Sequence, residues 1–479
     1  MSTTQPHKPV SPLKRLIAPF ASIKLTVVLL GLSIILVMAG TLAQTEMGIW
    51  DVLHKYFRSL YVFIPLRIFF PGDINPRLAL PFPGGYTIGM VMLVNLLAAH
   101  SVRFKIKARG ARLTAGLVLL PIGVASIVWL HNGPLPAKIL ARSGGYAGVL
   151  PLMGIGAMFY APLVVSCMLA FSRRTGIVLI HSALILLLVG EGVTAGSAVE
   201  TQMPIYEGTE VHWAQDARVV ELGIVDGSDP DSDFVVAIPQ ELLIQSFDSH
   251  VPIEHEALPF SITVDRYLSN SILARVDETA PSPQTIRGIG AEVMAVPQSR
   301  ASGVDGGMGT NFPGAYLTLH AGTEILGTWM VSPNLGIDQY VIAEQEVTVG
   351  DKVYRIALRF RRYYKPYSLF LTKFNHDLYP GTQIPKNFSS DLRLKHPEEN
   401  VDRALSVSMN NPLRYAGETF FQSGWIPGAQ QGDPDRGTVL MVVRNPGWTI
   451  PYIACALGTI GLALQFGSSL SRFLKRSKS

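Results

Sequence analysis

Residues 173–206 read RRTGIVLIHSALILLLVGEGVTAGSAVETQMPIY, and within this stretch a long apolar run passes directly into polar, alternating sequence. Its apolar run, near Gly176–Ala195, has the length of about 20 residues that a helix needs to cross a hydrocarbon core of about 30 Å. Two basic residues, Arg173 and Arg174, precede the run, and beyond it the helical period gives way to the alternation typical of strands. The stretch therefore predicts a membrane helix that leads directly into a large polar domain.

The composition of the whole chain agrees with a membrane protein. Of 479 residues, 48% are hydrophobic and only 16% are charged, and the mean hydropathy is +0.29. A soluble domain carries about 25% charged residues, so the deficit excludes an ordinary cytosolic globule and a disordered chain. The two cysteines, Cys167 and Cys455, each lie in an apolar run, which excludes a disulfide framework, a redox CxxC pair and a zinc finger.

Six apolar segments are candidate spans. Five precede the polar stretch and one follows it. The expected spans lie near Ile23–Ala43, Tyr86–Ala99, Leu113–Leu130, Leu150–Phe171, Gly176–Ala195 and Trp448–Phe466. An alternative with four spans demotes one pair to buried helices and leaves the polar domain on the same side of the membrane.

Lysine and arginine in the short connections set the orientation. With six spans, the basic segments all fall on one side, which the positive-inside rule assigns to the cytoplasm. The sequence thus predicts a multi-pass membrane protein with both termini cytoplasmic. Its expected parts are a cytoplasmic flank (1–22), a membrane region of about five spans (23–195), an extracytoplasmic domain (196–447), a last helix (448–466) and a basic cytoplasmic tail (467–479).

The extracytoplasmic domain is expected to be mainly β and of sandwich type. Strand-like alternation recurs between Gly, Pro, Asp and Asn turns, with few convincing helices; expected strands include Tyr340–Val349, Lys352–Arg362 and Ser368–Phe374. The Gly-, Pro- and Ser-rich stretch Pro281–Gly314 is expected to be a loop. Counted from the sequence, residues 196–447 hold about 19 basic and about 31 acidic residues. This charge gives no support for nucleic-acid binding and suits the docking of a basic protein.

The sequence contains no P-loop, no GxGxxG after a strand, no HExxH and no GxSxG elbow. The candidate chemistry therefore rests on ionisable residues within the spans. His181 lies about five residues inside the fifth span, where a polar side chain is costly and usually faces the bundle interior. Its imidazole can ligate haem iron, or it can hydrogen-bond a neighbouring helix.

Other ionisable residues are weaker candidates for a functional role. His100 and His131 close the second and third spans, where a solvated histidine competes with a cofactor ligand. Glu191 can pair with a cation or act in a proton relay. His54 and His376 are expected to be a surface and a structural histidine.

Two long motifs resemble the ResB family of cytochrome c biogenesis proteins. The first reads YSLFLTKFNHDLYPGTQIPKNFSSD over residues 367–391, and the second reads MNNPLRYAGETFFQSGW over residues 409–425. The run HSALILLLVG from His181 is similar to the histidine-bearing helix of that family, and the first span is similar too. The resemblance extends over about half of the chain, including both ends.

The resemblance implies a subunit that helps to carry haem across the membrane and deliver it to apocytochrome c. It implies a ResC/CcsA-like partner, and haem that is bound transiently and shared with that partner. His181 would be an axial ligand. The chain would belong to a haem-attaching complex rather than act as an enzyme alone. In the second motif, an aromatic tip is either a docking surface or core packing; its expected interaction residues are Asn411, Pro412, Leu413, Tyr415, Gly417, Gln422 and Trp425.

Two other functions remain open. A membrane-anchored scaffold would hold apocytochrome or the partner without binding haem. A transporter for another amphipathic solute would use Glu191 as a proton-coupled group. Relative to the family pattern, two additional spans are expected between Arg103 and Arg174, and arginines common after the histidine helix are absent here.

Overall fold

The computed structural model describes most of the chain. The described residues are 17–70, 78–103, 106, 108–132, 149–229, 232–276, 286–302, 310–336, 344–382, 385–428 and 436–477. The basic residues Lys8, Lys14, Arg15, Lys105 and Lys107, which help to set the expected orientation, lie outside them. So does Tyr340, where one strand was expected to begin.

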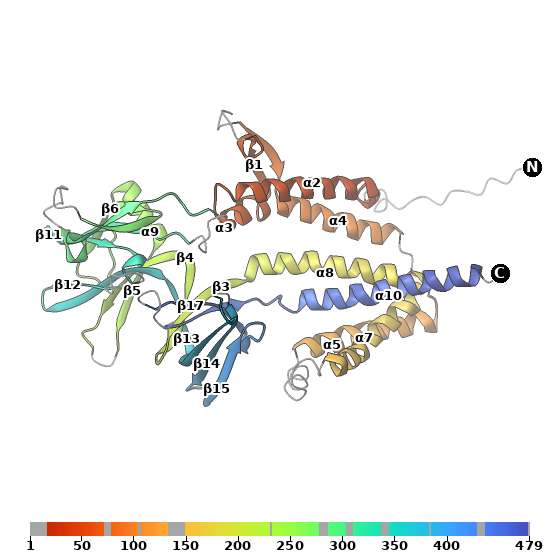
Figure 1. The fold of residues 1–479 in the computed structure, drawn as a ribbon. Helices are drawn as coiled ribbons and strands as arrows, with labels where there is room; N and C mark the ends of the chain where they lie inside the picture. Colours follow the sequence, from red (N-terminus) through yellow and green to blue (C-terminus); the bar gives the residue numbers. More distant parts are fainter. Residues whose placement is uncertain are drawn as a thin grey trace, which may run out of the picture. The chain divides into compact units, whose positions relative to one another are not determined.

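Within the described residues, a helix occupies each of the six expected span positions (Figure 1). These helices are α2 (Ile23–Ala43), α4 (Gly85–Arg103), α5 (Ala111–Asn132), α7 (Val149–Phe171), α8 (Thr175–Ser197) and α10 (Ile450–Ser477). Five of them are long and apolar enough to cross a membrane, and Gly156–Phe171 of α7 forms a shorter apolar helix. The expectation of membrane helices joined to a β domain is confirmed.

Glycines allow α8 and α10 to pack closely. A Cβ atom on Gly176 would lie 2.8 Å from the carbonyl oxygen of Gly461, and one on Gly461 would lie 2.9 Å from the carbonyl oxygen of Gly176. A Cβ on Gly190 would lie 2.7 Å from Ile450 further along the same pair. Small residues at such crossings let two helix backbones approach each other in a membrane. This contact fixes the position of α8, on which His181 lies.

A buried asparagine holds α4 against the start of α2. Asn95 is 3% exposed, and its Nδ2 donates to the carbonyl oxygens of Phe20 and Ser22 at 2.5 and 3.0 Å. Its Oδ1 accepts a hydrogen bond of 2.8 Å from Thr26. Because every polar atom of the amide group has a partner, burial of Asn95 is compatible with stability. The hydrogen bonds set the position of α4, which carries His100.

Short elements fill the first connection and the helix ends. Strands β1 and β2 form an antiparallel hairpin that the sequence analysis did not predict. These elements are η1 (Ala18–Ala21), α3 (Ile49–Val52), the π-helix η2 (Leu53–Phe57), β1 (Tyr61–Pro65), η3 (Leu66–Ile68), β2 (Ala79–Pro83) and η5 (Ser172–Arg174).

The chain folds into two compact units, and the second, residues 44–49 and 199–444, is mainly β, as expected. Its larger sheet has the order β15-β14-β13-β4-β3-β18-β17-β16, with β12 and β5 paired beside β13 and β4; a four-stranded sheet has the order β6-β10-β11-β8. The strands are β3 (Val199–Tyr206), β4 (Glu210–Asp226), β5 (Phe234–Pro239), β6 (Ser261–Leu268), β7 (Ser271–Arg275), β8 (Ile286–Arg287), β9 (Val293–Pro297), β10 (Gly314–Ala321), β11 (Glu324–Val331), β12 (Gln345–Val349), β13 (Lys352–Leu378), β14 (Pro385–His396), β15 (Val401–Ser408), β16 (Leu413–Tyr415), β17 (Glu418–Ile426) and β18 (Gly437–Arg444). The helical elements are α9 (Gln240–Ser249), η6 (Gly288–Ala291) and η7 (Pro333–Gly336).

This β domain has two main hydrophobic cores. In the first core, the two sheets face each other as in a sandwich, with residues such as Leu222 and Ile356 opposite Ile262 and Leu317. In the second core, the larger sheet curls so that strands from its two ends share one interior, which includes Leu392 and Phe420. The long strand β13 contributes to both cores and therefore joins them.

Three local features differ from the sequence expectation. Two strands expected at Lys352–Arg362 and Ser368–Phe374 are parts of one continuous strand, β13. The expected loop Pro281–Gly314 contains strands β8 and β9, and β9 pairs with β7, because its Val293–Pro297 segment buries Val293 and Ala295. Helix α9 was not expected; it buries Leu243 against the first core.

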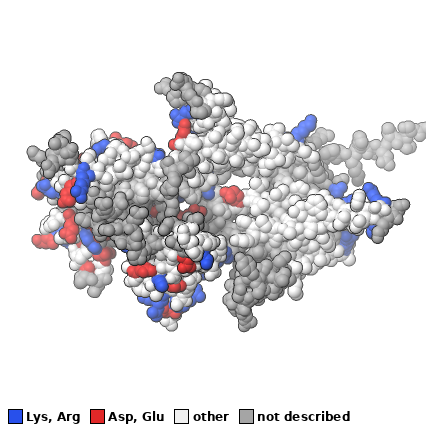
Figure 2. Space-filling view, viewed as in Figure 1, with Lys and Arg blue, Asp and Glu red and all other residues white. Residues whose placement is uncertain are grey.

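The two units differ in how many charged side chains they carry. On the visible face, the long helices are almost free of charged atoms, whereas the β domain carries Lys, Arg, Asp and Glu together (Figure 2). Ionisable groups are costly in a hydrocarbon environment, so this distribution fits helices that face lipid and a domain that faces water.

Candidate functional site

Two histidines from different helices come together among the membrane helices. His100 lies near the end of α4 and His181 near the start of α8, and their ring centroids are 4.8 Å apart. The ring planes meet at 72°, an edge-to-face arrangement. Both side chains are half-buried. The structure thus pairs the strongest histidine candidate of the sequence with one of the two weaker ones.

The backbone fixes the protonation pattern of both rings. His100 Nδ1 lies 2.7 Å from the carbonyl oxygen of Leu96, and His181 Nδ1 lies 2.8 Å from the carbonyl oxygen of Ile177. A carbonyl oxygen only accepts hydrogen bonds, so each Nδ1 carries the proton. In the neutral ring, Nε2 then holds the lone pair, which is the form in which imidazole binds a metal. Each ring is therefore held in the tautomer that can bind a metal through Nε2.

The arrangement fits one haem-iron ligand better than two on the same iron. Two imidazoles on opposite sides of one iron have ring centroids about 6 Å apart, given metal–nitrogen bonds of about 2 Å. The rings of His100 and His181 are closer than this and meet edge to face. One of them can therefore ligate while the other supports its orientation. Among the described residues, no group of three or more His, Cys, Asp and Glu side chains forms a candidate metal site.

The other ionisable candidates lie elsewhere. His131 Nε2 on α5 is 2.9 Å from the hydroxyl of Tyr160 on α7, so it joins two helices and is not part of the histidine pair. Glu191 is exposed on α8, and His54 is exposed on the π-helix η2.

The interaction residues expected in the second motif mostly shape a β-hairpin. Tyr415 pairs with Glu418 across a two-residue turn, and both turn residues, Ala416 and Gly417, have positive φ angles of 49° and 76°. Such a turn matches the twist of the flanking strands and favours Gly in this position. Asn411, Gly417 and Trp425 are exposed, whereas Pro412, Leu413, Tyr415 and Gln422 are half-buried.

The two motifs pack against each other although they are separate in sequence. The rings of Phe388 and Trp425 are stacked, with centroids 5.1 Å apart, and His376 lies 4.5 and 5.2 Å from them. The buried Ser390 donates a hydrogen bond of 2.6 Å to Gln422. His376 is thus part of an aromatic cluster between β13, β14 and β17, and Gln422 is part of a satisfied polar network.

A nearly buried ion pair that the sequence did not predict binds the second motif to the residues at the start of the first. Lys365 lies 2.6 Å from Glu418, and both side chains are nearly buried. The hydroxyl of Tyr367 donates to the same carboxylate. Burial raises the pKa of Tyr367, and its hydrogen bond to Glu418 raises it further. The two motifs therefore pack as one module, which hydrophobic patterning does not indicate because the contacts join residues that are distant in sequence.

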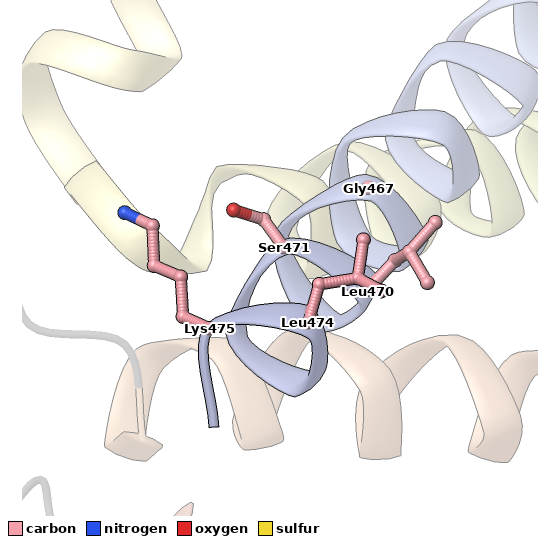
Figure 3. Close-up of a pocket in the computed structure, with 5 residues that line it drawn as sticks. All are labelled: Gly467, Leu470, Ser471, Leu474 and Lys475. Atoms are coloured by element: carbon pink, nitrogen blue, oxygen red, sulfur yellow. The ribbon is translucent and has the colours of Figure 1, made fainter. Parts of the chain in front are cut away.

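A hollow beside the C-terminal end of α10 does not resemble a catalytic site. Its lining residues are Gly467, Leu470, Ser471, Leu474 and Lys475 (Figure 3). The leucines point to one side, whereas Ser471 and Lys475 point to the other. Leucines with a terminal lysine are what a helix end presents at a membrane interface.

Comparison with known proteins identifies the module. Residues 315–433 match the model of the ResB-like family, and they include both motifs and the strands between them. A 109-residue stretch is 34% identical to Protein NrfI of Wolinella succinogenes; it covers 22% of this chain and 11% of that protein. Residues 315–433 are thus similar to the ResB-like family, and the resemblance seen in the sequence is confirmed.

Proposed function

We propose that the chain is a cytochrome c assembly subunit, which helps to carry haem across the membrane and deliver it to apocytochrome c. A ResC/CcsA-like membrane protein would act with it. The ResB-like region and the similarity to NrfI support a role in cytochrome c biogenesis. The observation that carries the haem proposal is the His100–His181 pair on two apolar helices.

In this proposal His181 is the axial ligand of the transported haem, through Nε2. Its Nδ1–H bond to Ile177 and the glycine contacts of α8 hold the ring in place. His100 lies against the ring of His181 and limits its rotation. The rings of His100 and His181 are too close to lie on opposite sides of one iron, so His100 would not be the second axial ligand. The proposal assigns that ligand to the partner.

The proposed orientation places the β domain outside the bacterial inner membrane and both termini in the cytoplasm. The basic ends of the helices support this, for example Arg472, Lys475 and Arg476 near the end of α10. Haem would then enter near the His100–His181 pair, which lies close to the cytoplasmic ends of α4 and α8.

An absorption spectrum of the complex with its partner tests the haem proposal. The wild type should show a Soret band, and His181→Ala should lose it or shift it, because one axial ligand is removed. His131→Ala is the matched control, since His131 is also a half-buried histidine near a span end but binds Tyr160. Its spectrum should equal that of the wild type.

Two outcomes would contradict the proposal. An unchanged Soret band in His181→Ala would show that His181 is no ligand. A wild-type complex with partner bound but without haem would remove the haem mechanism and favour the scaffold.

A further inference from the structure

The long strand β13 changes its pairing with β4 twice within a few residues. The register shifts between Phe360 and Arg362, and again between Tyr364 and Leu369. Opposite the first shift, Asp216 accepts hydrogen bonds from the backbone N–H groups of Arg218 and Val219 and so holds a bulge in β4. Bulges of this kind often re-aim side chains beside functional sites. The segment between the shifts is Arg361-Arg-Tyr-Tyr-Lys365.

The side chain of Arg362 lies over an aromatic ring on the neighbouring strand. Its guanidinium carbon is 4.2 Å from the ring centroid of Trp213, which favours a cation. Tyr364, opposite Trp213 in the register, is 53% exposed and leaves one side of this site open. A guanidinium over a ring still presents N–H donors at its edge, which suit a carboxylate.

The charges around Arg362 are not balanced within the described residues. Glu221 is bound by Arg359 at 3.1 Å, and both side chains are nearly buried. The backbone N–H of Arg362 donates to Glu221 at 3.4 Å, but no Asp or Glu of the described residues forms an ion pair with its guanidinium, and its buried Nε–H has no acceptor among them. Burial lowers the pKa of Arg362, and the charge of Arg359 lowers it further. A partly buried cation of this kind is costly, and an added anion would stabilise it.

We infer that Arg362, with Trp213 and Tyr364 as aromatic walls, is a binding site of the β domain for a carboxylate of a porphyrin. The guanidinium, held over Trp213 and without a carboxylate partner among the described residues, supplies the recognition of the carboxylate, and the exposed ring of Tyr364 supplies apolar surface beside it for the macrocycle. Only the identity of the ligand as a porphyrin rests on the proposed function. The site requires no iron and does not involve His181.

The test uses the full-length protein in detergent and metal-free protoporphyrin IX, followed by porphyrin fluorescence. The comparison ligand is protoporphyrin dimethyl ester, which has the same ring but no free carboxylate. Wild type should bind the diacid about tenfold more tightly than the diester, and Arg362→Gln should weaken diacid binding about tenfold. Arg393→Gln is the control, because Arg393 is exposed and paired with Asp402. The diacid fluorescence measured with Arg393→Gln should equal that of the wild type, and it includes any porphyrin that partitions into the detergent.

Equal binding of diacid and diester by the wild type would overturn the inference without any variant. Equal diacid binding by Arg362→Gln and Arg393→Gln would also overturn it. Arg362→Lys keeps the charge and guards against a folding defect; it should bind with an intermediate affinity. His181→Ala should keep its affinity for the metal-free diacid. A wild-type protein that binds the diacid but never haem iron would therefore refute the proposed function and leave this inference standing.

Discussion

Single residues determine where the candidate ligands lie. Asn95 fixes α4 through three hydrogen bonds, and the Nδ1 contacts of His100 and His181 fix both rings. The sequence identified His181, because a histidine within an apolar span is conspicuous. It did not predict that His100 touches it, since the two lie on spans that are not consecutive and helix packing is not encoded in local periodicity.

Acid should destabilise the β domain in part through Asp226. A hydrogen bond from Lys352, with further bonds from Ser228, lowers the pKa of Asp226 from its usual 3.8 to about 2. The folded state therefore binds this proton less readily than the unfolded chain. Its stabilising contribution is present above about pH 4 and is lost as the pH falls towards 2.

The variant Asp226→Asn should have a lower denaturant midpoint than the wild type at pH 6 and nearly the same midpoint at pH 2. Chemical unfolding followed by tryptophan fluorescence measures both values. Glu254→Gln, on an exposed loop, is the control and should change neither. A difference between wild type and Asp226→Asn that is as large at pH 2 as at pH 6 would contradict the assigned pKa shift.

At the scale of elements, the close contact of α8 with α10 is the most sensitive feature. Gly176→Ala should destabilise the helices by about 1–3 kcal/mol, because its Cβ would meet backbone atoms of α10. Gly192→Ala on the same helix should have little effect, since a Cβ there meets nothing within 4 Å. Thermal unfolding in one detergent compares the two, and equal losses would argue against the observed contact.

The sequence predicted most elements but few of their connections. Long apolar runs predicted the six helices, and alternation predicted much of the second unit. The single strand β13 was divided in two, because Lys365 and Pro366 interrupt its alternation. Strand β9 was hidden in a Gly-rich stretch. The interlocking of the two motifs through Lys365, Tyr367 and Glu418 depends on tertiary contacts that no local pattern reveals.

The whole molecule combines nearly uncharged helices with a charged β domain. The proposed orientation can be tested by labelling introduced cysteines, in a background in which Cys167 and Cys455 are replaced by alanine. A membrane-impermeant maleimide should label Glu254→Cys in spheroplasts. It should label Ser477→Cys only after the membrane is opened. The reverse pattern would invert the topology and place the β domain in the cytoplasm.

Chemical rescue of the ligand position tests whether His181 binds the haem iron. His181→Gly, purified with its partner, should lack the wild-type Soret band, and added imidazole should restore it by occupying the position of the lost ring. His131→Gly should show the wild-type band with or without imidazole. A His181→Gly complex that keeps the wild-type band before imidazole is added would contradict the assignment of His181 as the haem ligand.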